Sequence, residues 1–171
     1  IAPASAQALS MVRVGEGGMS AVRFDDVWKE YGDHIVLERI TLDVEPRAFL
    51  ALVGPSGCGK TTFLRMLLGE ETPTRGQILI DGTPLSPEPD ADRGVVFQRY
   101  SVFPHLTVFE NIGFGLRMQR MPNAEVKARV ERNAELMHIE QLLGRYSGEL
   151  SGGQRQRVAV ARALAMEPDV I

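Results

Sequence analysis

The first half of the chain carries the hydrophobic pattern of β-strands. Short segments either alternate apolar and polar residues or cluster β-forming side chains, and turn residues separate them. The run at residues 48–53 is continuously apolar, which is typical of a strand buried on both faces. The expected strands are residues 21–28, 40–44, 48–53, 76–80 and 94–97, with the opening of another at 169–171.

After Phe97 the pattern changes to helical spacing. Apolar residues recur every three or four positions over residues 108–118, 124–138 and 153–166, and Pro122, Gly144 and Gly148 break the periodicity. One earlier helix is expected at about residues 60–68, directly after a glycine-rich loop. The order of strands, loop, helical insert and returning strand predicts an α/β fold with a helical lobe at about residues 99–165.

Composition narrows the class of protein without identifying it. The 171 residues suffice for one domain or most of one, and 44% apolar with 24% charged residues is ordinary for a globular chain. No apolar run is long enough to span a bilayer. A net charge of −3 argues against nucleic acid as a partner, and a single cysteine favours a reducing compartment.

Residues 1–20 differ from the rest of the chain. They are mostly Ala, Ser and Gly, and only Arg13 and Glu16 are charged. This texture predicts a disordered leader, with the folded domain at residues 21–171. A sharper hypothesis makes Met19 the true start, because residues 15–18 would be encoded by purine-rich codons typical of a ribosome-binding site.

The strongest chemical signal is GPSGCGKT at residues 54–61, which fits the phosphate-loop pattern G-x-x-x-x-G-K-[ST] completely. It lies between an expected strand and an expected helix, which is the context that the pattern requires. Glycines let the backbone approach phosphates closely, and the helix N-terminus adds its positive end. Lys60 is expected to reach the β- and γ-phosphates, and the Thr61 hydroxyl to ligate Mg²⁺. The expected nucleotide-binding residues are Gly54, Pro55, Ser56, Gly57, Cys58, Gly59, Lys60, Thr61 and Thr62.

A second candidate anion site lies 91 positions beyond Lys60, in the sequence LSGGQ at residues 150–154. Ser151 is a good N-cap, and Gly152 and Gly153 would expose backbone N–H groups at the start of a helix. The residues alone leave two readings open, because a capped helix with small residues for packing has the same pattern.

Together the two motifs resemble the ATP-binding cassette (ABC) ATPases, whose signature motif matches LSGGQ, and the similarity extends over residues 22–171. The resemblance implies a P-loop NTPase core with an N-terminal antiparallel β-subdomain and an inserted α-helical lobe, using ATP and Mg²⁺. In that family Tyr31 would stack on adenine, Gln98 would be the Q-loop residue at Mg²⁺ or the attacking water, and Lys60 and Gln98 would act in catalysis. Ser151, Gly152, Gly153 and Gln154 would contact ATP held by an opposite subunit.

The resemblance also implies partners. Two ATPase subunits, alike or different, would sandwich two ATP molecules, and transmembrane permease subunits would dock from the membrane. The apolar stretch at residues 100–108 is a candidate dock, although the same residues could instead pack inside the lobe. The stretch at 94–118 resembles bacterial importer ATPases of both the nitrate/sulfonate/taurine and the polyamine/sugar groups. A peripheral place at the cytoplasmic face of the inner membrane follows, with the cargo left open.

The chain departs from the family at its C-terminal end, where the fold is expected to be incomplete. The resemblance places the Walker B aspartate, the catalytic glutamate and the switch histidine beyond Ile171. We therefore expect ATP hydrolysis coupled to import from the full-length protein, and little or none from this chain alone. The alternatives are a cassette ATPase of the translation-factor or DNA-repair type and a non-hydrolysing fragment.

Overall fold

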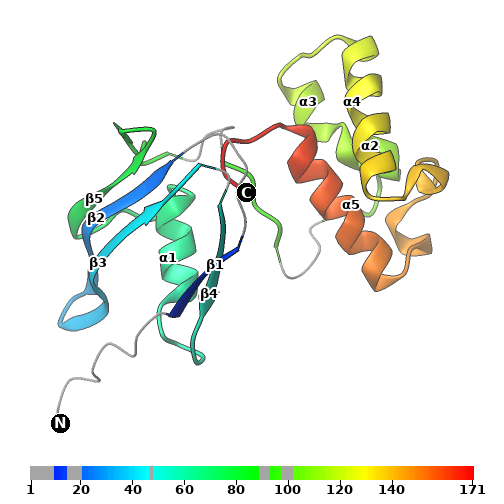
Figure 1. The fold of residues 1–171 in the computed structure, drawn as a ribbon. Coiled ribbons are helices and arrows are strands. Elements are labelled where there is room, and N and C mark those ends of the chain that lie inside the picture. The colour runs from blue at the N-terminus through cyan, green and yellow to red at the C-terminus, as the bar shows by residue number, and fades with distance from the viewer. Residues whose placement is uncertain (1–9, 15–20, 47, 89–92, 98–101) are drawn as a thin grey trace. The chain divides into compact units, whose positions relative to one another are not determined.

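The computed structural model describes residues 10–14, 21–46, 48–88, 93–97 and 102–171 (Figure 1). The chain divides into two compact units, Ile1–Asp90 and Ala91–Ile171. Among the residues just given, those of the first unit form the strands and helix α1 (Lys60–Leu67), and those of the second form the remaining helices. No helix among the described residues is both long and apolar enough to cross a membrane.

An antiparallel sheet forms the larger part of the first unit. Its strands are β2 (Val22–Tyr31), β3 (His34–Val44), β5 (Arg75–Ile80) and β6 (Thr83–Pro84), in the order β3-β2-β5-β6. Tyr31 pairs with His34 across the tight turn between β2 and β3. This sheet is the antiparallel β-subdomain that the sequence led us to expect.

Helix α1 (Lys60–Leu67) packs through its apolar side against residues of this sheet. The rings of Phe63 on α1 and Phe24 on β2 stack with their centroids 4.2 Å apart. Burial of these rings holds the start of the helix, and with it the preceding glycine-rich loop, at a fixed place on the sheet. The buried apolar residues of the unit are Val22, Phe24, Val27, Leu37, Phe63, Met66 and Ile78.

A separate two-stranded sheet contains β4 (Phe49–Val53), the strand that leads into the glycine-rich loop. Its antiparallel partner is β1 (Ser10–Val14), with Met11 opposite Leu52 and Val14 opposite Phe49. The prediction of a leader without regular structure is therefore wrong at residues 10–14. The prediction that β4 is buried on both faces is also wrong, because Phe49 is 64% and Val53 is 54% exposed. In the described chain β4 pairs with β1 alone, and so its ends stay uncovered.

The described residues of the second unit form the helices α2 (Val108–Ile112), α3 (Phe114–Met118), α4 (Asn123–Leu136) and α5 (Gly152–Ala165). Short 3-10 turns occur at Glu140–Leu142 and Ser147–Glu149. The single helix predicted at residues 108–118 is in fact two, because the chain breaks at the buried Gly113. Helix α5 packs against α2 and α4 around one apolar core, whose residues include Val108, Ile112, Leu116, Val126, Val130, Val158 and Ala161.

Buried Asn111 organises the loop before α2. Its amide nitrogen donates to the carbonyl oxygens of Phe103, Leu106 and Thr107, and its carbonyl oxygen accepts from the Phe103 N–H at 2.8 Å. Thr107 and Glu110 then form a capping box at the start of α2. One fully buried side chain thus fixes most of the apolar loop that the sequence marked as a candidate dock.

The strand predicted at residues 94–97 does not form. Arg93 makes one parallel bridge with Val170, and the Gly94 N–H donates to the Val170 oxygen at 2.7 Å. Within the described residues this single bridge is all the pairing that residues 93–97 have, and one bridge is too short for a ladder. The predicted opening of a strand at residues 169–171 is likewise reduced to this pair.

Candidate nucleotide site

The glycine-rich loop runs from the end of β4 to the start of α1, as the motif requires. Gly59 is the N-cap of α1 and has φ of +91°, a conformation that other residues rarely adopt. A Cβ built on Gly59 would lie 2.7 Å from Cδ2 of Leu37 on β3. Glycine is therefore needed at this position twice over, for its backbone angle and for the close approach of the loop to β3.

At the other end of the loop, Gly54 lies against the side chain of Cys58. A Cβ on Gly54 would lie 2.6 Å from the Cys58 sulfur, well inside contact distance. The Cys58 N–H donates to the Pro55 oxygen and closes a turn at 3.4 Å. The two ends of the loop thus close on each other, and the sulfur fills the space that the missing Gly54 side chain leaves.

Lys60 reaches back across this loop. Its ammonium donates to the carbonyl oxygens of Gly54 at 2.7 Å and Pro55 at 2.8 Å, and its Nζ lies 3.5 Å from the Cys58 sulfur. The sequence predicts that this ammonium meets phosphates, and the structure places it inside the loop that would hold them. The positive charge is thus anchored by backbone oxygens at the site rather than directed into solvent.

The start of α1 differs from the starts of α2 and α5. Both of those helices begin with a capping box, in which a side chain accepts from a backbone N–H of the first turn. The N-cap of α1 is Gly59, which offers no side-chain acceptor, and the first turn of α1 contains no acidic residue. The first N–H groups of α1 keep their capacity to donate, next to the ammonium of Lys60. Thr61 is exposed at this end of the helix, and Thr62 is half-buried.

Tyr31 lies at the end of β2 and is 48% exposed. Its hydroxyl donates to a carboxylate oxygen of Glu71, and the Lys29 ammonium sits over the ring, 5.0 Å from its centroid. The hydrogen bond to Glu71 is the main cause that raises the pKa of Tyr31, with burial and the Glu71 charge adding to it, while a hydrogen bond with Thr62 works in the opposite direction. Through Thr62 the structure brings Tyr31 next to the helix that begins at the glycine-rich loop.

The LSGGQ segment begins helix α5 in the second unit. The Ser151 hydroxyl accepts from the Gln154 N–H at 3.3 Å, and the Gln154 side chain accepts from the Ser151 N–H at 2.8 Å. The sequence-based reading of Ser151 as an N-cap is confirmed. A Cβ on Gly152 or Gly153 would meet nothing within 4 Å among the described residues, and neither glycine has a positive φ. Each glycine lowers helix stability relative to alanine, and packing within the described chain does not require glycine at either position.

Gln98 lies outside the residues that the structure describes, together with Tyr100 and Ser101 of the candidate dock. Of the rest of that stretch, Val102 packs against the core of the second unit. The Phe103 ring lies 4.7 Å from that of Phe114 and 5.3 Å from the Arg162 guanidinium. Part of the stretch at 100–108 therefore packs inside the lobe, which is the alternative that the sequence left open.

Sequence reasoning missed Glu71 and Lys29. Glu71 lies 40 positions from Tyr31 in the chain, in the turn between α1 and β5, and no motif marks it. The one signal for Lys29 is that it alternates with Tyr31 along a predicted strand and so shares its face. Only the fold places these two side chains beside Tyr31.

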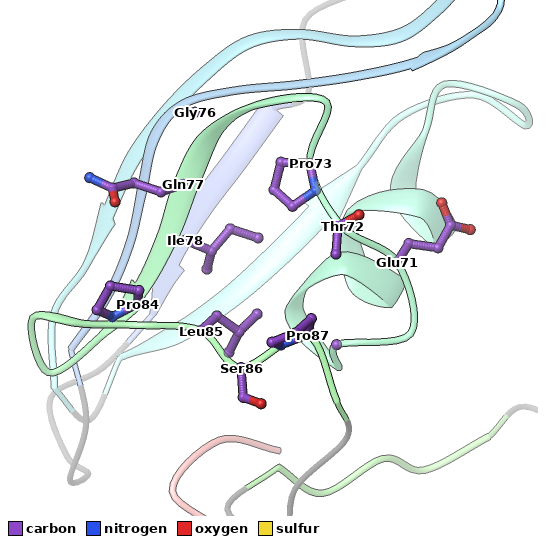
Figure 2. Close-up of a pocket in the computed structure, with 11 residues that line it drawn as sticks. Glu71, Thr72, Pro73, Gly76, Gln77, Ile78, Pro84, Leu85, Ser86 and Pro87 are labelled. Carbon is purple, nitrogen blue, oxygen red and sulfur yellow. The ribbon is translucent and has the colours of Figure 1, made fainter.

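A cavity of about 170 Å³ lies on the other side of the same turn (Figure 2). The residues that line it come from the α1–β5 turn and from the β5–β6 hairpin and the segment after it, and include Pro73, Ile78, Pro84, Leu85 and Pro87. The figure shows the Glu71 carboxylate directed away from this cavity. None of the residues that the sequence predicts for nucleotide binding lines it.

Comparison with models of known protein families shows which family this chain belongs to. Residues 37–171 match the family described as ABC transporter. The chain belongs to this family. The ABC transporter assignment and the α/β fold with an antiparallel sheet agree with the sequence-based expectation, and members of the family bind ATP.

The chain is similar to curated proteins that are named as import ATP-binding proteins. It is 48% identical over 153 residues to the sulfate/thiosulfate import ATP-binding protein CysA of Gloeobacter violaceus, covering 88% of this chain and 44% of that protein. It is 46% identical over 161 residues to the trehalose/maltose import ATP-binding protein MalK of Thermococcus litoralis, covering 89% and 43%. It is 49% identical over 142 residues to the spermidine/putrescine import ATP-binding protein PotA of Mesorhizobium japonicum, covering 82% and 39%.

The fold matches a solved ABC transporter structure. The structure of cbiO1 from Clostridium perfringens, part of the complex cbiONQ, aligns with a TM-score of 0.76 and 26% sequence identity, covering 86% of this chain and 62% of that one. The chain spans less than half the length of the three curated relatives described above. Their names divide among sulfate, sugar and polyamine import at nearly equal identity, so similarity does not select a cargo.

Proposed function

We propose that this chain is part of the ATP-binding subunit of an ABC importer, in which ATP binding and hydrolysis drive the uptake of a solute. The observation that carries the proposal is the glycine-rich loop with the Lys60 ammonium held inside it, at the uncapped start of α1. Membership of the ABC transporter family and the names of the import relatives support the transport role. The same names disfavour a translation-factor or DNA-repair role.

The residues of the loop are suited to bind a nucleoside triphosphate. Lys60 provides three donor hydrogens on one ammonium, and the first N–H groups of α1 add donors of the helix N-terminus. We propose that Gly54 to Thr62 hold the phosphates, with Lys60 exchanging its bonds to the Gly54 and Pro55 oxygens for bonds to the β- and γ-phosphates. That exchange moves a charge only a short way, because the ammonium already lies in the loop.

Mg²⁺ belongs to the same proposal. Thr61 is exposed beside the loop, and its hydroxyl would hold the ion. Gln98, which lies outside the described residues, would be the second ligand. When bound, Mg²⁺ would neutralise charge on the phosphate oxygens during transfer. Lys60 would then stabilise the same charge from the loop, and Gln98 would orient water.

The LSGGQ segment fits a nucleotide held by another subunit. Ser151 uses an acceptor lone pair in the capping box, so its O–H hydrogen is left to donate, which suits a phosphate oxygen. The open space at Gly152 and Gly153 would let phosphates approach the backbone closely. We propose that Ser151, Gly152, Gly153 and Gln154 contact ATP across a dimer of ATPase subunits.

A membrane permease is the proposed partner of the second unit, which would hold the subunit at the cytoplasmic face of the membrane. Phe114 and Met118 lie one helical turn apart on α3, and Met118 is 66% exposed. Phe114 also contacts Phe103, which links this exposed apolar pair to the candidate dock at residues 100–108. We propose that the described part of this stretch acts together with α3 in docking.

Thermal unfolding with and without ATP and Mg²⁺ tests the proposal. Ligand that binds only the native state stabilises it by about 2.7 kcal/mol at a hundredfold excess over Kd. We expect the midpoint to rise with ATP in the wild-type chain and not in a Lys60→Ala variant. Lys127→Ala on α4, which removes an exposed lysine with one weak ion pair, is the control and should keep the response. An equal response in the Lys60→Ala variant would reject the loop as the site.

A further inference from the structure

Glu71 reaches Tyr31 from a distant part of the chain. The carboxylate accepts the hydrogen bond of the Tyr31 hydroxyl across 40 positions of sequence. Glu71 lies in the turn that leaves α1, so it connects the helix that follows the glycine-rich loop to the end of β2. Figure 2 shows that its carboxylate is directed away from the neighbouring cavity, and it instead accepts the hydrogen bond of Tyr31.

Two cations hold Glu71 in place. Lys29 Nζ lies 3.2 Å from one carboxylate oxygen, and Arg65 lies 3.5 Å from the other. Lys29 is nearly buried and is itself fixed, because its ammonium also donates to the Thr72 oxygen at 2.9 Å. An ion-paired carboxylate with 18% of its side chain exposed is an acceptor whose position is set before any ligand arrives.

The same cluster decides which face of the Tyr31 ring is available. The Lys29 ammonium sits over the ring, 5.0 Å from the centroid, while almost half of the side chain remains exposed. One face is thus taken by a cation, and a base could stack on the other. A ring held at its hydroxyl needs no further ordering when a base arrives, and ordering a side chain costs about 0.5–1.5 kcal/mol.

We propose that Glu71 is a positioning residue for adenine: by holding the Tyr31 hydroxyl it fixes the plane of the ring on which the base stacks. Lys29 and Arg65 act through Glu71 by holding its carboxylate. The inference rests on the proposed function, because it assumes that Tyr31 contacts the base of a nucleotide bound at the loop. It concerns only the base, since the partners of Glu71 described above, Tyr31, Lys29 and Arg65, all lie outside the glycine-rich loop.

The test compares a ligand that has a base with one that has none. Calorimetric titration of the 171-residue chain with ATP and Mg²⁺, and separately with inorganic tripolyphosphate and Mg²⁺, measures the two affinities. The variants are Glu71→Gln, Tyr31→Phe, their double variant and Tyr31→Ala. Glu70→Gln is the matched control, because it removes the same charge from the adjacent position, where the pairing with Arg65 is looser and more exposed.

We expect Glu71→Gln and Tyr31→Phe each to weaken ATP binding about threefold to tenfold, which is the cost of ordering the ring on binding. The double variant should be no weaker than either single one, because both act on the same hydrogen bond: Tyr31→Phe removes its donor, and Glu71→Gln replaces its charged acceptor with a neutral, weaker one that Lys29 and Arg65 no longer hold by charge. Tripolyphosphate affinity should change less than twofold in all of them, and Glu70→Gln should bind ATP as the wild type does.

Three results would overturn the inference. They are unchanged ATP affinity in Glu71→Gln, equal losses for ATP and tripolyphosphate, and additive losses in the double variant. If Tyr31→Ala binds ATP as tightly as the wild type, the adenine role of Tyr31 fails and the inference with it, while the phosphate loop stands. Should Glu71→Gln fail to fold, Tyr31→Phe breaks the same bond without touching the charge cluster and decides alone.

Discussion

The ring of Phe63, four positions into the first unit's helix, stacks on the ring of Phe24 in the sheet with an interplanar angle of 19°. Both rings are fully buried, and Phe63 follows the glycine-rich loop by only a few residues. The packing of these two apolar side chains therefore fixes the position of the glycine-rich loop on the sheet.

Removal of one of these rings should lower the stability of the first unit. Phe63→Ala loses the stack and leaves a cavity, and we expect it to lower the free energy of unfolding by about 3–5 kcal/mol. Denaturant titration of the first unit, followed by the fluorescence of Trp28, measures the change. Leu64→Ala, at the adjacent position where the side chain is 49% exposed, should cost much less. Equal costs would contradict the role of the stack.

The loss of stability caused by a substitution at Gly54 should be offset by a substitution at Cys58. Gly54→Ala places a Cβ 2.6 Å from the Cys58 sulfur, and we expect this clash to cost about 1–3 kcal/mol of stability. Cys58→Ala removes the sulfur, so the double variant should recover most of the loss. Thermal unfolding of the four proteins forms a double-mutant cycle. A double variant as unstable as the sum of the single ones would show that the contact does not limit the loop.

Alkylation of Cys58 should block nucleotide binding. Its sulfur lies within the loop, 3.5 Å from Lys60 Nζ, and it is the chain's single cysteine, so a maleimide modifies one defined place. We expect complete alkylation to abolish ATP binding and bound ATP to slow the reaction, as measured by mass spectrometry and calorimetry. Cys58→Ala treated with the same reagent should still bind. Full binding by a completely alkylated wild-type chain would contradict the prediction.

Asn111→Ala should loosen the second unit around α2. The substitution removes one acceptor and the donor for three carbonyl oxygens from a fully buried position, and we expect a cost of about 2–4 kcal/mol. Amide hydrogen exchange over Val108–Ile112 measures the local effect. Asn123→Ala, at the exposed start of α4, is the control. Unchanged protection of α2 in the Asn111 variant would show that the network is dispensable.

The Glu71 cluster should make stability depend on pH in a defined direction. The hydrogen bond from Tyr31 is the main cause that lowers the pKa of Glu71, with Lys29 and Arg65 adding to it. Its contribution is therefore present above the ordinary carboxyl pKa, about 4.3, and is lost as the pH falls through the lowered value. Tyr31 has a raised pKa, so its contribution is lost only in alkali, as the pH rises through that value.

The difference in unfolding free energy between the wild type and Glu71→Gln measures this dependence. We expect it to be constant from about pH 6 to about pH 9 and to shrink in acid. A difference that stays constant through the acid range would show that the Glu71 carboxylate is not held by its neighbours.

Local patterns predicted most of the strands and helices and the starts of α1 and α5 at the two glycine motifs, because the information for these features lies in adjacent residues; they missed β1 and wrongly predicted a strand at residues 94–97. The phosphate-loop pattern placed Lys60 correctly at the start of a helix, and the Ser151 cap lies where the sequence put it. Both depend on backbone geometry within a few positions. The break at Gly113 escaped prediction, because the apolar spacing continues through it and only its burial beside Val126 marks the site.

Contacts between distant residues were not predictable in the same way. The pairing of Tyr31 with Glu71 depends on how the turn after α1 meets the end of β2, and no local pattern encodes that meeting. The prediction that Phe49 is buried was wrong for a related reason. A continuous apolar run reports the tendency of a strand to be buried, whereas its actual burial depends on which segments lie beside it.

The pairing of β1 with β4 bears on the order in which the site forms. Its partners lie between 35 positions apart, for Val14 and Phe49, and 43 apart, for Ser10 and Val53, whereas the β2–β3 hairpin closes through a two-residue turn. Contacts close in sequence form faster than distant ones, because less chain entropy is lost in closing them. The hairpin that bears Tyr31 is thus expected to form early, and the ladder that anchors the strand before Gly54 late. The surface for the base would then be ready before the cradle for the phosphates.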